Sequence, residues 1–374
     1  MHVKSMLLVL CVLLASAAGS QGKLHGLTHS PLSMNHLDLC IDKNTLLANM
    51  ELVAQYSKNF RVYSIATCQE NTKAVLDFAR ERKMGVMLGV WISKDVALNK
   101  AEMKAMRKYT RLYKDVIEAV IVGNEPIFVI KLDVDDLLGY MKSAKTFLTK
   151  RKINIPVTTA EVWPLFQFNT TVGQALVDHS DFICMQIQPY WEGFSVRCAD
   201  DPDAEDDCVD AGTHVELKAQ EIEDLYNKEV VICETGWPTF GETCCEGREF
   251  SKDGFKAVPS EKGATEFLED LVAATSKSGR PYYYHEAIDA DWKRIWAPCT
   301  ECTGLTPDFG CSPSRPNPGC EVDYHFGLFT NEKVLKNITI PTAPTAKEQL
   351  TKDEIQKAVT SIVETAKRKA ETRG

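Results

Sequence analysis

Short apolar runs, rich in β-branched and aromatic residues, alternate along the chain with segments whose apolar residues recur at helical spacing. Runs of about four to eight such residues are typical of buried strands, and recurrence at the helical period indicates amphipathic helices. The pattern predicts strands at 24–28, 60–65, 85–91, 119–122, 156–159, 182–186, 230–233 and 282–284. The clearest helical patterns between them lie at 44–59, 70–83 and 261–279.

This strict alternation of strand and helix predicts an α/β fold. Eight strand and helix units in one chain of 374 residues fit a (β/α)₈ TIM barrel better than an open doubly wound sheet. The first strand is followed by "LHGLTHS" at 24–30, which has a lone glycine rather than a glycine-rich phosphate loop. We therefore expect a barrel and no dinucleotide or other cofactor.

Two insertions and a tail interrupt the barrel pattern. The acidic stretch 198–212 places Asp201, Asp203 and Glu205 at alternate positions, as calcium loops do, but it lacks their glycine and terminal glutamate. A solvated loop closed by a disulfide is therefore favoured, and no metal site is predicted. The second insertion, 294–322, is rich in cysteine, proline and glycine and follows the eighth strand. On a barrel it would overhang the C-terminal face, where active sites lie.

The chain is predicted to fall into three parts. Residues 1–20 have a short apolar core after His2 and Lys4 and are typical of a signal peptide, with cleavage near Ala17 or Ser20. Residues 21–330 form the barrel, and 331–374 form a proline-containing linker and an amphipathic C-terminal helix. That helix either packs outside the barrel or acts as a tail for a partner or a cell wall. We expect a secreted, extracellular or cell-wall protein.

The cysteines and charge agree with secretion. Of 13 cysteines, Cys11 leaves with the signal peptide, and several disulfides are expected among the others. Cys198 and Cys208 flank the acidic loop, and four more lie together after the last strand, at Cys299, Cys302, Cys311 and Cys320. Zinc is the alternative for "CTEC" at 299–302, but no second close pair follows. Cys244 and Cys245 pair with each other or elsewhere.

A formal net charge of −9 argues against nucleic acid or an anionic membrane surface as the main partner, so a neutral substrate is expected. We also expect a monomer. The sequons at Asn169 and Asn337 are possible glycosylation sites, which also suit a secreted chain. No serine hydrolase triad order and no zinc protease spacing occurs among the eight histidines.

Two glutamates follow predicted buried strands. Asn124 and Glu125 end the strand at 119–122, and Glu234 ends the strand at 230–233. Polar residues just past barrel strands are catalytic candidates, and apolar surroundings let a carboxylic acid keep its proton near neutral pH. Two such carboxyl groups suit glycoside hydrolysis, in which one protonates the leaving oxygen and the other attacks the anomeric carbon. A structural ion pair is the alternative for either glutamate alone.

The residues around these glutamates resemble a known family. "VGNEP" with Glu125 and "ETGWPTFG" with Glu234 resemble the two catalytic signatures of glycoside hydrolase family 17, the secreted β-1,3-glucanases and glucanosyltransferases of plants, fungi and fungus-like organisms. Further similar segments, in order, are "FRVYSI", "VTTAEVW", "QPYW", "EAIDADWK" and "FGLF". The cysteine loop and C-terminal arrangement resemble fungal or oomycete-like members more than plant members.

The resemblance implies a retaining double displacement, with the carboxyl groups about 5–5.5 Å apart. Glu125 would be the acid/base and Glu234 the nucleophile. Asn124 would hydrogen-bond the sugar's 2-hydroxyl or the nucleophile. Tyr63 would line the same subsite, and Arg61 beneath it would keep the nucleophile ionised. The implied substrate is a β-1,3-glucan polysaccharide or oligosaccharide, which the enzyme would hydrolyse or transfer to another glucan.

Other matches and departures concern the rest of the cleft. Lys293 matches the family turn and is expected to contact substrate, whereas Ala290 replaces a glutamate and Gln188 stands where plant members carry tyrosine. Aromatic faces for pyranose rings are expected from Tyr190, Trp191 and Trp237. Support or substrate contact is expected from Glu161 and Glu286, and a structural role is favoured for His285. The competing hypothesis is a non-catalytic glucan-binding or wall protein on the same barrel.

Overall fold

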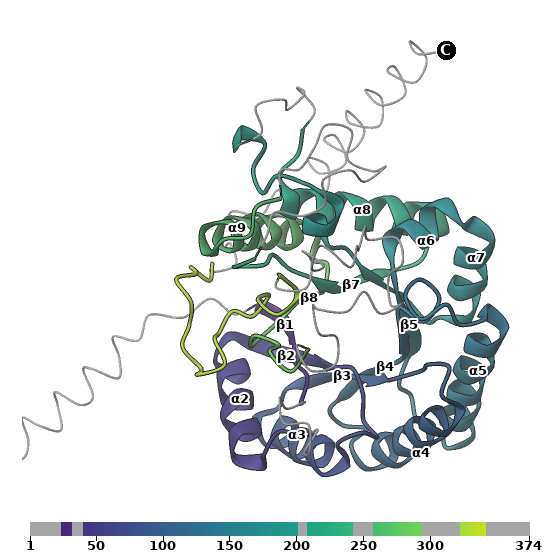
Figure 1. Ribbon diagram of the computed structural model, residues 1–374. Coiled ribbons are helices and arrows are strands. Elements are labelled where there is room, and N and C mark those ends of the chain that lie inside the picture. The colour runs from purple at the N-terminus through teal and green to yellow at the C-terminus, as the bar shows by residue number, and fades with distance from the viewer. Residues whose placement is uncertain (1–23, 32–39, 201–207, 242–256, 294–321, 342–374) are drawn as a thin grey trace, which may run out of the picture.

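The fold is a closed barrel of eight parallel strands surrounded by helices (Figure 1). The computed structural model describes residues 24–31, 40–200, 208–241, 257–293 and 322–341. The strands are β1 (Leu24–Thr28), β2 (Ser57–Val62), β3 (Gly85–Val90), β4 (Ile117–Asn124), β5 (Val157–Val162), β6 (Ile183–Gln186), β7 (Val230–Thr235) and β8 (Tyr282–Tyr284). Each pairs with the next, and β1 closes the ring on β8. The expected (β/α)₈ barrel is confirmed.

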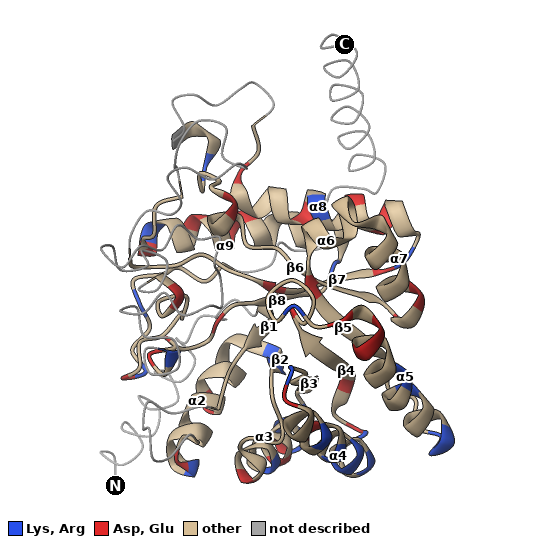
Figure 2. Ribbon diagram, turned by 45° about the vertical axis from the view of Figure 1, so that its right-hand side comes forward, with Lys and Arg blue, Asp and Glu red and all other residues tan. Residues whose placement is uncertain are grey.

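The described helices form the outer layer of the molecule. They are α2 (Lys43–Tyr56), α3 (Gln69–Arg82), α4 (Val96–Leu112), α5 (Val134–Lys150), α6 (Trp163–Phe168), α7 (Thr170–His179), α8 (Ala211–Tyr226) and α9 (Glu261–Ser278). Two 3₁₀ turns, η1 (Pro189–Glu192) and η2 (Cys198–Asp200), follow β6. Several helices begin where a side chain accepts the free backbone N–H groups, as Asp42, Asp95 and Ser260 do. Figure 2 shows Lys, Arg, Asp and Glu residues along these outer helices.

Both faces of the strands are buried, as their continuous apolar runs predict. Inside the barrel a small cluster fills the axis, made of Met87, Ala119, Ile121, Ala160, Phe182, Cys184, Val231, Cys233 and Tyr283. The larger core lies between strands and helices and includes Val120, Ile232 and Phe267. Because the interior is packed, a substrate has access to the barrel only at its ends.

The ends of three strands differ from the sequence prediction. β7 continues through Glu234 to Thr235, so Glu234 lies inside the strand rather than just beyond it. β4 likewise reaches Asn124. β2 ends earlier than predicted, at Val62, because the backbone N–H groups of Ile65 and Ala66 donate to the Glu102 carboxylate instead of a neighbouring strand.

Three disulfides join described cysteines: Cys40–Cys68, Cys184–Cys233 and Cys198–Cys208. The last closes the acidic loop as expected. The interior Cys184–Cys233 bond was not foreseen, because the predicted barrel makes β6 and β7 neighbours but does not fix the register that brings these two cysteines together. The predicted signal peptide, Cys244, Cys245, the cysteine cluster at 299–320 and the C-terminal helix lie outside the described residues. Within the described part, no helix has the length and apolar character needed to cross a bilayer.

Candidate active site

Glu234 is held at the C-terminal end of β7 by two residues of the β2 region. Tyr63 donates its hydroxyl to Glu234 Oε2 at 2.7 Å, and Arg61 places Nη1 3.4 Å from the same oxygen. The side chain of Arg61 is only 1% exposed and that of Glu234 is 12% exposed. The positive charge and the hydroxyl both stabilise the ionised carboxylate.

Asn124 and Gln186 complete this network. Arg61 Nη2 donates to Asn124 Oδ1 at 2.5 Å, and Gln186 Nε2 donates to the same oxygen at 2.7 Å. Gln186 Nε2 also lies 3.3 Å from Glu234 Oε2, and Gln188 Nε2 lies 3.3 Å from Oε1. Asn124 therefore contacts Glu234 through its neighbours, while its amide nitrogen has no partner within this network. Gln186, the last residue of a predicted strand, was not expected in the site.

These contacts decide the protonation of Glu234. Burial by itself raises the pKa of a carboxyl group, but the surrounding donors outweigh it and the pKa of Glu234 lies below its ordinary value. His285 attracts the carboxylate only when protonated, and burial lowers the pKa of His285 to about 4. At neutral pH the permanent charge of Arg61, the Tyr63 hydroxyl and the more distant charge of Lys293 therefore keep Glu234 ionised.

Glu125 has the opposite electrostatic surroundings. Burial raises its pKa well above the ordinary value, and the charges of Glu234 and Glu161 add to this effect more than Arg61 offsets it. Because all the barrel strands are parallel, Glu125 after β4 and Glu234 in β7 both lie at the C-terminal end of the barrel. The surroundings thus favour the protonated form of Glu125 and the ionised form of Glu234.

The backbone around Glu125 departs from regular strand geometry. Glu125 has φ +48°, in the left-handed region that non-glycine residues seldom adopt, and its N–H donates to Ala160 O at 2.8 Å. Gly123 has φ +88°, and a Cβ there would meet Pro126 Cγ at 2.7 Å. Such strain persists only where the surroundings hold it, and it turns the Glu125 side chain out of the strand's alternation.

Glu161 supports this turn from β5. It is fully buried, and its Oε1 accepts the Ile127 N–H at 2.6 Å. Burial raises the pKa of Glu161 to about 7. This hydrogen bond fits a supporting role for Glu161, which was one of the two roles expected from the sequence.

The chain is similar to known proteins in sequence and in fold. Residues 26–302, which make up more than half of the chain, match the family model of the BtgE/BtgC glycoside hydrolase domain. The chain belongs to the BtgE/BtgC glycoside hydrolase family. The glycoside hydrolase relationship expected from the two glutamate signatures is confirmed.

Fungal relatives are about a quarter identical to this chain over the aligned residues. A probable glucan endo-1,3-beta-glucosidase of Aspergillus fumigatus is 25% identical over 291 residues, which cover 72% of this chain and 39% of that protein. The chain thus spans about two fifths of the length of this relative. A glucan 1,3-beta-glucosidase of Schizosaccharomyces pombe is 25% identical over 288 residues, covering 76% of this chain and 82% of that protein.

Solved structures show the same fold. A glycoside hydrolase family 17 beta-1,3-glucanosyltransferase from Rhizomucor miehei has a TM-score of 0.64 at 20% identity and covers 87% of this chain and 100% of its own. An endo-laminarinase from Formosa has a TM-score of 0.62 at 17% identity, covering 92% of this chain and 90% of its own. At these identities the likeness shows the barrel fold alone.

Two of the expected aromatic contacts of this BtgE/BtgC protein are wrong. Tyr190 and Trp237 are both 0% exposed, and they pack against each other with ring centroids 5.9 Å apart. The Trp237 indole donates to Val258 O and packs on Phe267 of α9. Their rings belong to the core, where the Trp237 ring contacts both Tyr190 and Phe267. Only Trp191 remains partly exposed, with its ring stacked on Phe326.

The β8 end brings a further set of titratable groups to the site. His285 Nδ1 lies 3.1 Å from the Tyr63 hydroxyl and 3.0 Å from Thr28 Oγ1. Lys293 pairs with Asp323 at 2.9 Å and lies 3.8 Å from Glu286. Burial opposes the charge of Lys293, yet these two acids outweigh it and raise its pKa. His285 thus contacts the Tyr63 hydroxyl, which fits the structural role expected for it from the sequence.

A polar cavity of about 150 Å³ adjoins this end of the barrel. It lies between α2 and the segments after β1 and β8, and its lining includes His29, Asn49, Glu286, Asp289 and Trp292. Among the described residues, His29 Nδ1 and Glu286 Oε1 have no hydrogen-bond partner. Polar atoms without a hydrogen-bond partner beside a tryptophan side chain offer the mixed surface that sugar hydroxyls and ring faces require.

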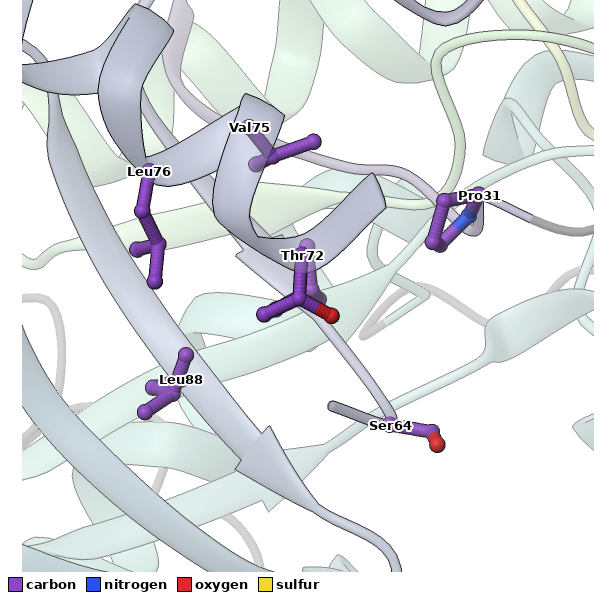
Figure 3. A pocket seen from close by; sticks show the side chains of 7 residues that line it. Pro31, Ser64, Thr72, Val75, Leu76 and Leu88 are labelled. Carbon is purple, nitrogen blue, oxygen red and sulfur yellow. The ribbon is translucent and has the colours of Figure 1, made fainter. Parts of the chain in front are cut away.

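A second cavity has no such chemistry. It measures about 10 Å³, enough for no more than a water molecule, and its lining is mostly apolar, with Ser64 and Thr72 beside residues such as Val75, Leu76 and Leu88 (Figure 3). It is a packing gap in the core. Within the described residues, no group of His, Cys, Asp and Glu side chains is arranged to hold a metal ion.

Proposed function

We propose that the chain is a retaining glycoside hydrolase or transglycosylase that acts on β-1,3-glucan. One observation carries the proposal. Two neighbouring glutamates at the C-terminal ends of β4 and β7 have opposite pKa shifts, upward for Glu125 and downward for Glu234. Titratable pairs whose surroundings push their pKa values apart mark the acid and the nucleophile of a double displacement.

The proposed reaction has two steps. In the first, the Glu234 carboxylate attacks the anomeric carbon while Glu125 gives its proton to the departing glycosidic oxygen, so that a glycosyl ester forms on Glu234. In the second, the Glu125 carboxylate takes a proton from water or a sugar hydroxyl, whose oxygen displaces Glu234 from the anomeric carbon. Water completes hydrolysis, and a sugar hydroxyl completes transfer. Carboxyl groups about 5–5.5 Å apart belong to this proposal.

The remaining site residues have positioning and binding roles in the proposal. Arg61 and Tyr63 keep Glu234 ionised and aligned, and Asn124 contacts the sugar's 2-hydroxyl through its amide nitrogen. Trp191 offers its partly exposed ring to a pyranose, and Lys293 contacts substrate hydroxyls together with Glu286. The polar cavity beside Glu286 is large enough to accept part of one sugar unit.

The choice of β-1,3-glucan follows from the relatives. Fungal members are named glucan endo-1,3-beta-glucosidase and glucan 1,3-beta-glucosidase, and a solved structure of similar fold holds laminaritriose. We place the protein outside the cell or in the cell wall, as a monomer, after removal of residues 1–20. The disulfides among the described residues support an oxidising compartment.

Digestion of laminarin and laminari-oligosaccharides by the purified protein tests the function. We expect turnover, and sizing of the products distinguishes its two forms, because oligosaccharides longer than the substrate mean transfer and only shorter ones mean hydrolysis. Digestion of a β-1,4-glucan in parallel tests the linkage. No turnover of any β-glucan would contradict the proposal, and binding without turnover would identify a glucan-binding protein.

A further inference from the structure

A disulfide lies directly beneath the proposed nucleophile. Cys184 of β6 and Cys233 of β7 are joined with their Cα atoms 5.3 Å apart, and both side chains are 0% exposed inside the barrel. Cys233 is the residue immediately before Glu234. The bond therefore anchors the backbone one residue away from the carboxylate that the proposed reaction uses.

The pairing of β6 with β7 changes register at this point. Met185 pairs with Ile232, but the next residue, Gln186, pairs with Glu234, so that Cys233 is an extra residue in β7. Such a bulge breaks the alternation of side chains and re-aims the residue that follows it. Cys233 lies in the interior cluster, yet its neighbour Glu234 also faces the barrel mouth, where it meets Arg61 and Gln186.

The main chain of Cys233 is held as well. Its carbonyl oxygen accepts a hydrogen bond from Arg61 Nη1 at 2.9 Å, and the same nitrogen lies 3.4 Å from Glu234 Oε2. Any shift of residue 233 would therefore move both the backbone of the nucleophile and the guanidinium that stabilises its charge. A bulged residue has lost its regular ladder partner, so a covalent bond to β6 is the strongest restraint available to it.

We propose that the Cys184–Cys233 disulfide is a positioning element for the proposed nucleophile: it fixes the β7 bulge that aims Glu234 at the anomeric carbon. The inference rests on the proposed function. Misplacement of a reacting group by about 1 Å costs on the order of a hundredfold in rate, so a bond that merely stabilised the barrel and a bond that aligned Glu234 have different kinetic consequences.

Removal of two disulfides, one at the site and one away from it, separates these roles. C184A/C233A removes the interior bond, and C198A/C208A removes the bond that closes the acidic loop. Loop-closure entropy predicts that both variants lose stability, and the first loses more because its bond spans 49 residues rather than 10. Both are assayed on laminarin oligosaccharides at a temperature at which their near-ultraviolet circular dichroism matches that of the unsubstituted protein.

We expect kcat of C184A/C233A to fall about tenfold to a hundredfold while KM stays within about threefold. The control variant should keep kcat within about twofold, because its cysteines lie outside the network around Glu234. An unchanged kcat in folded C184A/C233A would overturn the inference while leaving the proposed function intact. An inactive unsubstituted protein would instead contradict the proposed function.

Two further measurements cover the case in which C184A/C233A does not fold. C184V/C233A restores part of the lost volume and is held to the same kinetic criterion. Mapping of peptides from the unsubstituted protein, digested without reduction, tests the bond itself. A linked pair of peptides containing Cys184 and Cys233 supports the inference, and free thiols at these positions or pairing with other cysteines would overturn it, whatever the protein's activity.

Discussion

At the scale of single residues, Glu125 and Glu234 have the same side chain but different surroundings. Glu234 receives a guanidinium and a phenol hydroxyl, whereas Glu125 is subject to burial and to the charges of Glu234 and Glu161. The first arrangement favours the charged form and the second favours the neutral form. Acid and nucleophile are therefore distinguished by their neighbours and not by the residue type.

Removal of each carboxyl group should have its own chemical signature. We expect Glu234→Ala and Glu125→Ala each to reduce kcat/KM on laminarin at least about a hundredfold. With an aryl β-glucoside as substrate, azide should restore turnover in both variants. Glu125→Ala should give the β-glycosyl azide, because azide attacks the enzyme ester, and Glu234→Ala the α-glycosyl azide, because azide replaces the nucleophile. Product anomers are determined by NMR, and exchanged anomers would mean that the two roles are reversed.

Tyr63→Phe should change both the rate and its pH dependence. Loss of a hydrogen bond to a charged group reduces kcat/KM about tenfold or more. The hydroxyl helps to lower the pKa of Glu234, so its removal raises that pKa and moves the acidic limb of the pH profile to higher pH. Tyr113→Phe is the matched control, because its hydroxyl donates to Asp77 at 2.7 Å among outer helices. A Tyr63→Phe profile superimposable on the original would contradict this role.

At the scale of elements, the strand ends that carry chemistry are the irregular ones. β4 and β7 both change register with a neighbouring strand near their C-terminal ends. The loop after β2, which begins with Tyr63, is held by Glu102 of α4, which accepts from Ser64 Oγ and from the N–H groups of Ile65, Ala66 and Trp91. A buried carboxylate here accepts from three backbone N–H groups and one hydroxyl.

Glu102→Gln should therefore destabilise the protein. An amide has one acceptor oxygen and turns an NH₂ group toward the remaining donors, and buried donors left unsatisfied cost about 1–3 kcal/mol. We expect the free energy of unfolding, from urea denaturation, to fall by about 2 kcal/mol. Glu51→Gln, which removes an exposed partner of Arg82, should cost less than about 1 kcal/mol. Equal losses in the free energy of unfolding of the two variants would show that Glu102 does not stabilise the loop after β2.

At the scale of the whole molecule, closure of the barrel brings distant segments together. Arg61 and Glu234 are 173 positions apart, and Thr28 and His285 are 257 apart, yet each pair is in contact. The segment 322–341 packs against the end of β8, where Lys336 pairs with Asp289 at 2.6 Å. Burial of so many charges around one opening makes the stability of the molecule depend on pH.

Glu286 should account for part of this dependence of stability on pH. Burial raises its pKa to about 8, and Asp323, Asp289 and Glu234 add to the shift while Lys293 opposes it. In the unfolded chain the group ionises near its ordinary value of 4.5, so between these values the folded state binds more protons. Its contribution is present below about pH 4.5 and is lost as pH rises through about 8.

Glu286→Gln should remove this loss. Urea denaturation at a series of pH values should show that the free energy of unfolding of the variant declines less between pH 5 and 8 than that of the unsubstituted protein. Glu332→Gln, at an exposed position, controls for the change of residue type. Parallel declines in the original and the Glu286 variant would contradict the assignment.

The sequence by itself determined the order of strands and helices, the barrel and the placement of Glu125 and Glu234 at strand ends. These features follow from local periodicity and from where apolar runs stop, and both are properties of neighbouring residues. It also indicated that Arg61 and Tyr63 belong with Glu234, through the family resemblance and not through any pattern of spacing.

Only the tertiary structure decided which side chains meet. Trp237 and Tyr190 have the residue type of sugar contacts, but the packing of α9 and the β6 loop buries them. The partner of Cys233 depends on the register between β6 and β7, and the pKa of each glutamate depends on charges that other strands supply. Burial, pairing and protonation arise from contacts between residues far apart in the chain, and the closed barrel creates those contacts.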